Sequence, residues 1–160
     1  MINEKSPRDR ALKIPGPYPH ILLVRAPYYR SVVEGLTEGA IAVMGPVGCT
    51  HGILDVFGAF ELPQVIRLAL RGRRHYDGYI ALGCVVRGET DNYEFLCSAT
   101  MHGLMEVSLR YGISLGCGLL TVDTIAQAEA RSQPDEHNKG AEAAEAVLGQ
   151  ISATRRLGSW

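Results

Sequence analysis

Hydrophobic residues follow two different spacings along the chain. Four mainly apolar runs, at residues 21–24, 53–56, 76–86 and 113–121, are typical of strands that are covered on both faces. Between and after them, apolar residues recur every three or four positions, as on the buried face of a helix. These stretches cover residues 29–43, 62–70, 93–111, 124–131 and 140–155. In the third stretch, the residues on the face expected to be buried are Phe95, Leu96, Ala99, Leu104 and Val107. The pattern predicts strands that alternate with helices.

Alternation of this kind indicates a parallel sheet, because a helix that joins two neighbouring parallel strands has to cross a face of the sheet. We predict an α/β protein with three α/β/α layers around a flavodoxin-like, parallel four-stranded sheet. Residues 1–17 mix charges with Pro7, Pro15 and Pro17, and are predicted to be an N-terminal arm. The α/β domain then covers residues 18–157, and residues 158–160 form a C-terminal tail.

The composition narrows the class of protein. The 160 residues are 46% hydrophobic and 21% charged, with a net charge of -1, which fits one globular domain. A near-neutral chain lacks the basic excess that nucleic-acid binding needs. It also lacks a signal-peptide core and an apolar run of the roughly 18 residues that span a membrane. We therefore expect a cytoplasmic protein that binds neither nucleic acid nor membrane.

No metal site is expected. The four cysteines and five histidines are dispersed without the short spacings that metal ligands show. The cysteines, at positions 49, 84, 97 and 117, lie among apolar neighbours and are interpreted as buried thiols rather than disulfides.

The predicted topology indicates where a ligand would bind. In sheets of this type, ligands bind beyond the carboxyl ends of the strands, where loops and helix N-termini offer free backbone groups. The corresponding segments, residues 26–29, 57–61, 87–92 and the stretch after residue 121, carry aromatic, glycine-rich or polar sequence. From the residues alone, they point to a site for a phosphate and a planar ring.

Each candidate residue also has a purely structural interpretation. Thr90 or Asp91 could simply cap the helix that follows, and Glu61 could simply favour a helix N-terminus. Tyr28 could lie at the edge of the core. Arg131 and the nearby Lys139 could clamp a phosphate, or they could be solvated charges at helix ends.

Three separated motifs carry a resemblance to a known family. They are Gly-Ala-Phe-Glu-Leu-Pro at residues 58–63, Tyr-Asp-Gly-Tyr-Ile-Ala-Leu-Gly-Cys-Val-Val-Arg-Gly-Glu-Thr at residues 76–90, and Asn-Lys-Gly-Ala-Glu-Ala-Ala at residues 138–144. In this order they resemble the lumazine synthase family of riboflavin biosynthesis, from about His20 to Arg156. Three motifs in order are a more specific signal than one glycine-rich loop.

The resemblance implies a reaction and a set of site residues. The reaction condenses 5-amino-6-(D-ribitylamino)uracil with 3,4-dihydroxy-2-butanone 4-phosphate to give 6,7-dimethyl-8-ribityllumazine, water and inorganic phosphate, with no cofactor or metal. Substrate binding is assigned to Tyr28, as the ring-stacking aromatic, and to Ala59, Phe60, Glu61, Cys84, Val85, Val86 and Cys117. Phosphate binding is assigned to Glu89, Thr90 and Arg131, and the catalytic positions are those of Asn92, Arg131 and Lys139.

The resemblance also implies that neighbouring chains share each site, with Arg131 and Cys117 contributed by the neighbour. Members of the family form homopentamers, some of which close into a sixty-chain icosahedral shell, and riboflavin synthase is a further expected partner. The sequence predicts the pentamer and leaves the shell undecided, because Pro134-Asp135-Glu136 replaces a usually glycine-rich loop.

Two positions depart from the family pattern. Asn92 stands where the family has a histidine, its proposed proton shuttle, and Cys117 stands where it has a phenylalanine. Histidine exchanges protons near neutral pH, whereas an amide cannot. We therefore expect a working but slower enzyme. The alternative is a catalytically weak paralogue that binds flavin or lumazine, or that forms a structural shell.

Overall fold

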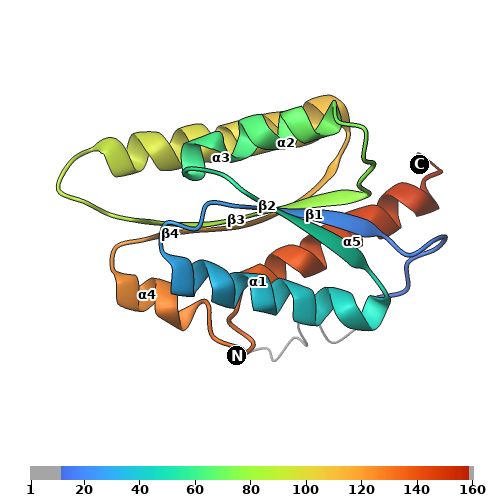
Figure 1. Cartoon of the computed structure of the whole chain (residues 1–160), viewed down its shortest axis with the longest axis horizontal. Helices are drawn as coiled ribbons and strands as arrows, with labels where there is room; N and C mark the ends of the chain where they lie inside the picture. Colours follow the sequence, from blue (N-terminus) through green and yellow to red (C-terminus); the bar gives the residue numbers. More distant parts are fainter. Residues whose placement is uncertain (1–11, 159–160) are drawn as a thin grey trace, which may run out of the picture.

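The parallel sheet predicted from the sequence is confirmed in the computed structural model, which describes residues 12–158 (Figure 1). All strand pairs are parallel, and the order across the sheet is β2-β1-β3-β4. In chain order the strands are β1 (His20–Arg25), β2 (Thr50–Asp55), β3 (Gly78–Val86) and β4 (Ser114–Val122).

Helices cover both faces of the sheet and complete the three layers (Figure 1). One face carries α2 (Leu62–Leu70) and α3 (Asn92–Tyr111), and the other carries α1 (Arg30–Met44), α4 (Ile125–Ala130) and α5 (Lys139–Arg156). There are also two short 3-10 helices: η2 (Gly45–Val47) directly follows α1, and η3 (Ala59–Glu61) directly precedes α2. Within residues 12–158, no helix combines the length and the apolar composition that crossing a bilayer requires.

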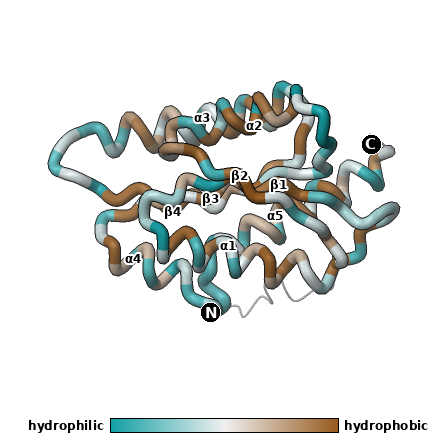
Figure 2. Tube along the Cα trace, viewed as in Figure 1, coloured by the Kyte–Doolittle hydropathy of each residue, from teal (hydrophilic) through white to brown (hydrophobic). Residues whose placement is uncertain are grey.

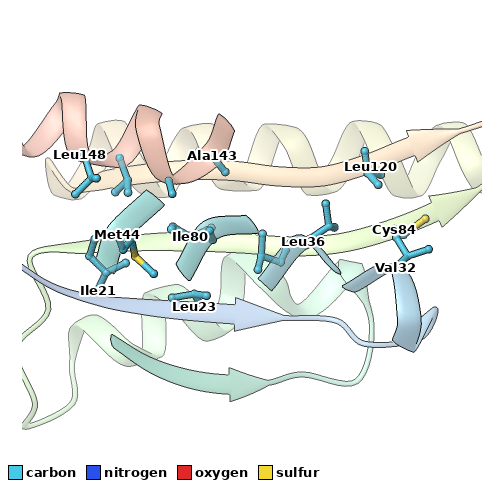
Figure 3. Packing of buried hydrophobic residues seen from close by; sticks show 14 of the residues in the cluster. Ile21, Leu23, Val32, Leu36, Met44, Ile80, Cys84, Leu120, Ala143 and Leu148 are labelled. Atoms are coloured by element: carbon cyan, nitrogen blue, oxygen red, sulfur yellow. The ribbon is translucent and has the colours of Figure 1, made fainter. Parts of the chain in front are cut away.

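The central strands β1 and β3 supply the core on both faces of the sheet. Toward α1 and α5 they present Ile21, Leu23, Ile80 and Leu82, which are fully buried and pack with helix residues such as Leu36 (Figure 3). The alternate strand residues pack against α2 and α3 in a second cluster. Burial of one large aliphatic side chain stabilises a fold by about 1.5–3 kcal/mol. Hydrophobic segments accordingly concentrate on the central strands, whereas the helices alternate in hydropathy (Figure 2).

Close backbone approaches fix the position of α5. A Cβ added at Gly140 would lie 1.9 Å from the carbonyl oxygen of Leu36 on α1. One added at Gly116 on β4 would lie 2.1 Å from the carbonyl oxygen of Ala143 on α5. Both distances are far below van der Waals contact, so only glycine fits. These contacts set α5 against α1 and β4, and thereby place Lys139 at the start of α5.

A buried arginine ties the carboxyl ends of β1 and β2 together. Nε of Arg25 donates to Oδ1 of Asp55 at 2.7 Å, and a terminal nitrogen donates to Oδ2 at 3.0 Å. Arg25 also donates to Glu34 and Thr37 on α1. The hydrogen bond from Arg25 lowers the pKa of Asp55, so this carboxylate is ionised at neutral pH. The two strand ends are therefore held by a bidentate ion pair.

The last residues of the predicted arm lie against α5. The carbonyl oxygens of Pro15 and Pro17 accept hydrogen bonds from Arg155, whose side chain is almost completely buried. Residues 1–11 of the predicted arm and residues 159–160 of the predicted tail lie outside the described residues.

The structure corrects the sequence prediction at α3 and β2. Helical spacing predicted that Phe95 and Ala99 face the core, but both are exposed, because α3 buries the face that carries Thr100 and Leu104. Apolar residues lie on several sides of this helix, so their spacing alone did not select the buried side. β2 begins before the predicted apolar run because Thr50 pairs with β1.

Replacing Gly140 with alanine should destabilise the protein, because the added methyl group would push α5 away from Leu36. We expect the free energy of unfolding to fall by about 1–3 kcal/mol, measured by urea denaturation at a fixed protein concentration. Gly149→Ala on α5 is the matched control, since an added Cβ there meets no atom within 4 Å. The control should be neutral or stabilising by up to about 1 kcal/mol. Equal stability of the two variants would contradict the close packing of α5.

Candidate functional site

The segments that follow the first three strands emerge at one edge of the sheet. Tyr28 follows β1, η3 follows β2, and the loop of residues 87–91 follows β3 (Figure 1). Tyr28 is 80% exposed, and its ring meets that of Tyr29 edge-on, with 5.0 Å between the centroids. Tyr28 is therefore not part of the core, and its ring is available to cover a planar ligand.

The turn between β2 and α2 places a carboxylate at this edge. The amide of Glu61 donates to the carbonyl oxygen of Gly58 at 3.2 Å, and a Cβ at Gly58 would lie 3.2 Å from a carboxylate oxygen of Glu61. Glu61 precedes α2, yet its side chain forms no capping hydrogen bond. Phe60 is exposed, whereas Ala59 is buried and accepts a hydrogen bond from Thr100 on α3 at 3.4 Å. The turn is therefore anchored to α3 and leaves Glu61 available to a ligand.

β3 extends beyond the end of β1 and leaves backbone groups with no strand beside them. The β1 ladder ends at Leu82, whose carbonyl oxygen accepts the amide of Ala26 at 2.9 Å. Alternate residues of a parallel strand face the same neighbour, so Cys84 and Val86 direct their backbone groups to the side that β1 no longer covers. Val85 is turned toward β4. Cys84 and Val86 therefore offer main-chain hydrogen bonds at the site.

The cysteine thiol at the end of β3 is not a ready nucleophile. All four cysteines are free. The prediction that all are buried is correct for Cys84 and wrong for Cys49, Cys97 and Cys117, which are half-buried. Burial raises the pKa of Cys84 to about 11, so this thiol is protonated at neutral pH. Cys84 therefore contributes shape and backbone groups.

Arg87 connects three elements at the carboxyl edge. Its Nε donates to Oδ1 of Asp123, just after β4, at 2.8 Å, and a terminal nitrogen donates to Glu94 in the first turn of α3 at 3.2 Å. The guanidinium also lies 4.4 Å from the centre of the Tyr93 ring. The hydrogen bonds to Asp123 and Glu94 raise the pKa of Arg87, which remains charged. Arg87 therefore anchors both ends of the loop before α3.

This loop carries the predicted phosphate-binding residues. Glu89, Thr90 and Asn92 are exposed. The hydroxyl oxygen of Thr90 accepts the amide of Asn92 at 3.3 Å, whereas Asp91 forms no side-chain capping bond. Thr90, the residue before the N-cap Asp91, thus satisfies one backbone amide at the start of α3. The positive end of the dipole of α3 also faces this loop and favours an anion there.

A groove of about 730 Å³ runs along β4 and brings Cys117, Arg131 and Lys139 together. Sγ of Cys117 lies 3.7 Å from Sδ of Met101 on α3. Lys139 donates to Glu142 at 3.2 Å. Within residues 12–158, the side chain of Arg131 forms no hydrogen bond or ion pair. Among the described residues, the groove therefore has one cation with an ionic partner, Lys139, and one without, Arg131.

The predicted site residues form two sets that lie on different parts of the sheet. β4 is an edge strand, and its groove lies beside it, whereas Tyr28 and Glu61 follow β1 and β2 on the other half of the sheet. In the part of the chain that is described, no hydrogen bond or ion pair joins Arg131 or Lys139 to the loop before α3. This separation fits a site that a neighbouring chain completes.

Several residues at these surfaces were not predicted from the sequence. Gln127 lines the β4 groove and forms a capping box with Thr124, for which the Thr-x-x-Gln spacing was an available signal. Phe57, which lies in the predicted segment 57–61 but was assigned no role, is 97% exposed beside the η3 turn. The Arg25–Asp55 pair joins residues that are 30 positions apart and has no local signal. Among the described residues, no three potential metal ligands gather in one place.

Replacing Arg87 with alanine should loosen the loop before α3, because Asp123 and Glu94 lose the cation that they share. We expect the backbone amides of residues 88–93 to exchange hydrogen for deuterium at least about 10-fold faster, followed by mass spectrometry. Arg110→Ala is the matched control, since it removes only an exposed ion pair near the far end of α3. If exchange in the Arg87 variant equals that in the control, other contacts hold the loop.

Comparison with known proteins shows the family of this chain. The family model described as 6,7-dimethyl-8-ribityllumazine synthase matches residues 19–155. Proteins of that name are similar to this chain: one from Nitrobacter winogradskyi is 42% identical, over 86% of this chain and 86% of its own length. Another from Bartonella tribocorum is 37% identical, over 88% and 93%, and one from Paramagnetospirillum magneticum is 39% identical, over 86% and 96%. The chain therefore belongs to the 6,7-dimethyl-8-ribityllumazine synthase family.

Proposed function

We propose that the protein is a working lumazine synthase. It condenses 5-amino-6-(D-ribitylamino)uracil with 3,4-dihydroxy-2-butanone 4-phosphate and releases 6,7-dimethyl-8-ribityllumazine, water and inorganic phosphate. The observation that carries the proposal is the carboxyl edge of the sheet. There, in a chain of this family, the η3 turn, the uncovered backbone of β3 and the loop before α3 border one surface.

The pyrimidine substrate is assigned to the end of β3. The uncovered backbone groups of Cys84 and Val86 would hydrogen-bond its polar edge, and Tyr28 would cover the ring. The carboxylate of Glu61 would accept hydrogen bonds from the ribityl hydroxyls. Main-chain groups on a buried strand are rigid, which keeps the reacting amine in one orientation.

The phosphate of the second substrate is assigned to the loop before α3. Backbone amides near Glu89 and Thr90 and the positive end of α3 favour an anion. Because Arg87 pairs with Glu94, that carboxylate does not oppose the phosphate with its full charge. The unpaired guanidinium of Arg131 would complete the site from a neighbouring chain, with Lys139 beside it.

Positioning is the larger contribution to the rate. The 5-amino group adds to the ketone with loss of one water, and phosphate leaves readily once the adjacent imine or enamine has formed. The ribitylamino nitrogen then adds to the remaining carbonyl and closes the ring with loss of a second water. Holding two reactants together supplies roughly 7–11 kcal/mol, whereas general acid–base catalysis contributes about 10²–10⁴-fold. Asn92 cannot exchange a proton near neutral pH, so water, the substrate phosphate or Glu89 would relay protons at a slower rate.

We infer that the assembly is a homopentamer in which the β4 groove of one chain faces the carboxyl edge of the next. Several large apolar side chains are exposed in the single chain, among them Phe57, Phe60, Phe95 and Leu109. Exposed apolar residues on this scale are typical of an interface. The sixty-chain shell, an association with riboflavin synthase and the cytoplasmic location remain predictions.

Purified protein that is mixed with both substrates should form the lumazine, followed by its absorbance. Arg131→Ala should lower kcat/KM by about 10²-fold or more, because the developing phosphate charge loses a cation. Arg71→Ala, an exposed arginine after α2, is the matched control and should leave the rate unchanged. If the native protein forms no lumazine, the proposal fails. Binding of lumazine or flavin without turnover would then support the alternative function.

Sites shared between chains can be tested by mixing two inactive variants. Glu61→Ala removes a group from the carboxyl edge, and Arg131→Ala removes one from the β4 groove. Co-assembled chains should regain up to about a quarter of the native activity, because one pairing in four joins two intact halves. Each variant assembled alone is the control. No recovery in a mixed pentamer, verified by light scattering and mass spectrometry, would show that one chain supplies the whole site.

Asn92→His should accelerate lumazine formation by about 10-fold or more, because an imidazole can shuttle the protons that the amide cannot. The added rate should fall as the pH drops below about 6.5, where a protonated imidazole no longer accepts a proton. Asn92→Gln, which keeps an amide, is the control and should not gain activity. An unchanged or lower rate for the histidine variant would show that Asn92 has a role beyond the absence of a proton shuttle.

A further inference from the structure

A second cavity lies at the opposite edge of the sheet, where the strands begin. It encloses about 330 Å³ between the α2–β3 connection, the turn from α3 to β4 and the end of α5, which lie on the same side of the molecule (Figure 1). The nine residues of β3, a length of roughly 30 Å, separate it from the carboxyl edge. Its volume is at the lower end of the range for pockets that enclose small organic ligands.

The polar wall of this cavity carries two arginines. Arg73 and Arg74 line it, and neither side chain has a hydrogen bond or an ion pair with any residue from 12 to 158. They belong to the basic segment Arg71-Gly72-Arg73-Arg74-His75, but Arg71 does not line the cavity. Two arginines that line one cavity bring several guanidinium donors within reach of one anion.

Asp77 is the one acidic residue of the lining, and it is already occupied. One carboxylate oxygen lies 3.4 Å from a nitrogen of Arg155 and 3.5 Å from Nε2 of His75. The other oxygen accepts the backbone amide of His20 at 2.8 Å. Asp77 is therefore held by its own partners and does not neutralise the two arginines.

The other wall of the cavity is apolar. It includes Leu70, Tyr79, Ile113 and Ile151. Tyr76, also in the lining, stacks on His20 with 5.0 Å between the ring centroids and meets Tyr79 edge-on at 5.8 Å. A ring-shaped ligand would therefore find a preformed apolar surface next to a pair of cations.

We propose that this amino-edge cavity binds a small aromatic phosphate monoester, with the phosphate on Arg73 and Arg74 and the ring against Tyr79, Ile113 and Ile151. A phosphate monoester carries about −1.5 to −2 charges at neutral pH, which matches two guanidinium groups better than a single carboxylate does. The cavity is separate from the proposed substrate site, so a ligand can bind there without occupying the site of the reaction.

Adenosine 5′-monophosphate is the probe, titrated by calorimetry into the native assembly. Arg73→Ala combined with Arg74→Ala should weaken its binding by at least about 10-fold, because both charged partners of the phosphate are lost. Arg71→Ala, which removes a neighbouring arginine outside the cavity, should change the affinity by less than about 2-fold. The double variant should form lumazine at the native rate, which verifies that the fold and the substrate site are intact.

Three further titrations distinguish the amino-edge cavity from the substrate site and from a simple anion site. Adenosine and inorganic phosphate, titrated singly, should each bind at least about 10-fold more weakly than the nucleotide, since each occupies one wall only. Arg131→Ala should leave nucleotide binding unchanged. The proposal is overturned if Arg131→Ala abolishes binding, if the double variant binds as the native protein does, or if the nucleotide does not bind at millimolar concentration. If inorganic phosphate binds as tightly as the nucleotide, the cavity does not recognise the aromatic ring, and that part of the proposal is wrong.

Discussion

The pairing of β1 with β3 is the interaction on which the functional site depends. A strand with large side chains on both faces cannot shift its register by one residue without turning each of them into the wrong cluster. The register that places Val24 opposite Ala81 is therefore strongly specified. Because β1 stops first in this register, it also determines how far the main chain of β3 projects at the carboxyl edge. Core packing thus sets the length of the polar surface that a flat ligand can contact.

Two arginines hold the loops at this edge, and they differ in their exposure to solvent. The side chain of Arg25 is only 9% exposed, so salt screens its pairing with Asp55 weakly. Arg87 is 46% exposed, and its ion pairs contribute more to the position of a loop than to stability. A buried arginine therefore holds the β1–β2 end, whereas a half-exposed arginine holds the loop before α3.

The fold could be predicted from the sequence because each strand and helix has its own local spacing. The placement of Glu61 at the carboxyl edge followed from topology alone. Phe95 was misplaced because α3 carries apolar residues on more than one side, and only packing against the sheet selects the buried one. The Arg25–Asp55 pair depends on two strands being neighbours, which no local pattern encodes. The sequence places Arg131 seven residues before the motif at 138–144 but does not indicate which chain's site this residue serves.

The buried thiol at the end of β3 has a consequence for oxidative damage. Peroxide attacks thiolates, and a group with a pKa of about 11 is ionised in only about one molecule in 10⁴ at neutral pH. Cys84 is also only 6% exposed, so an oxidant rarely reaches it. Sulfenic acid would therefore form first at the more accessible cysteines. The thiol of Cys84, next to the ligand surface, would therefore stay reduced in a cell under peroxide stress.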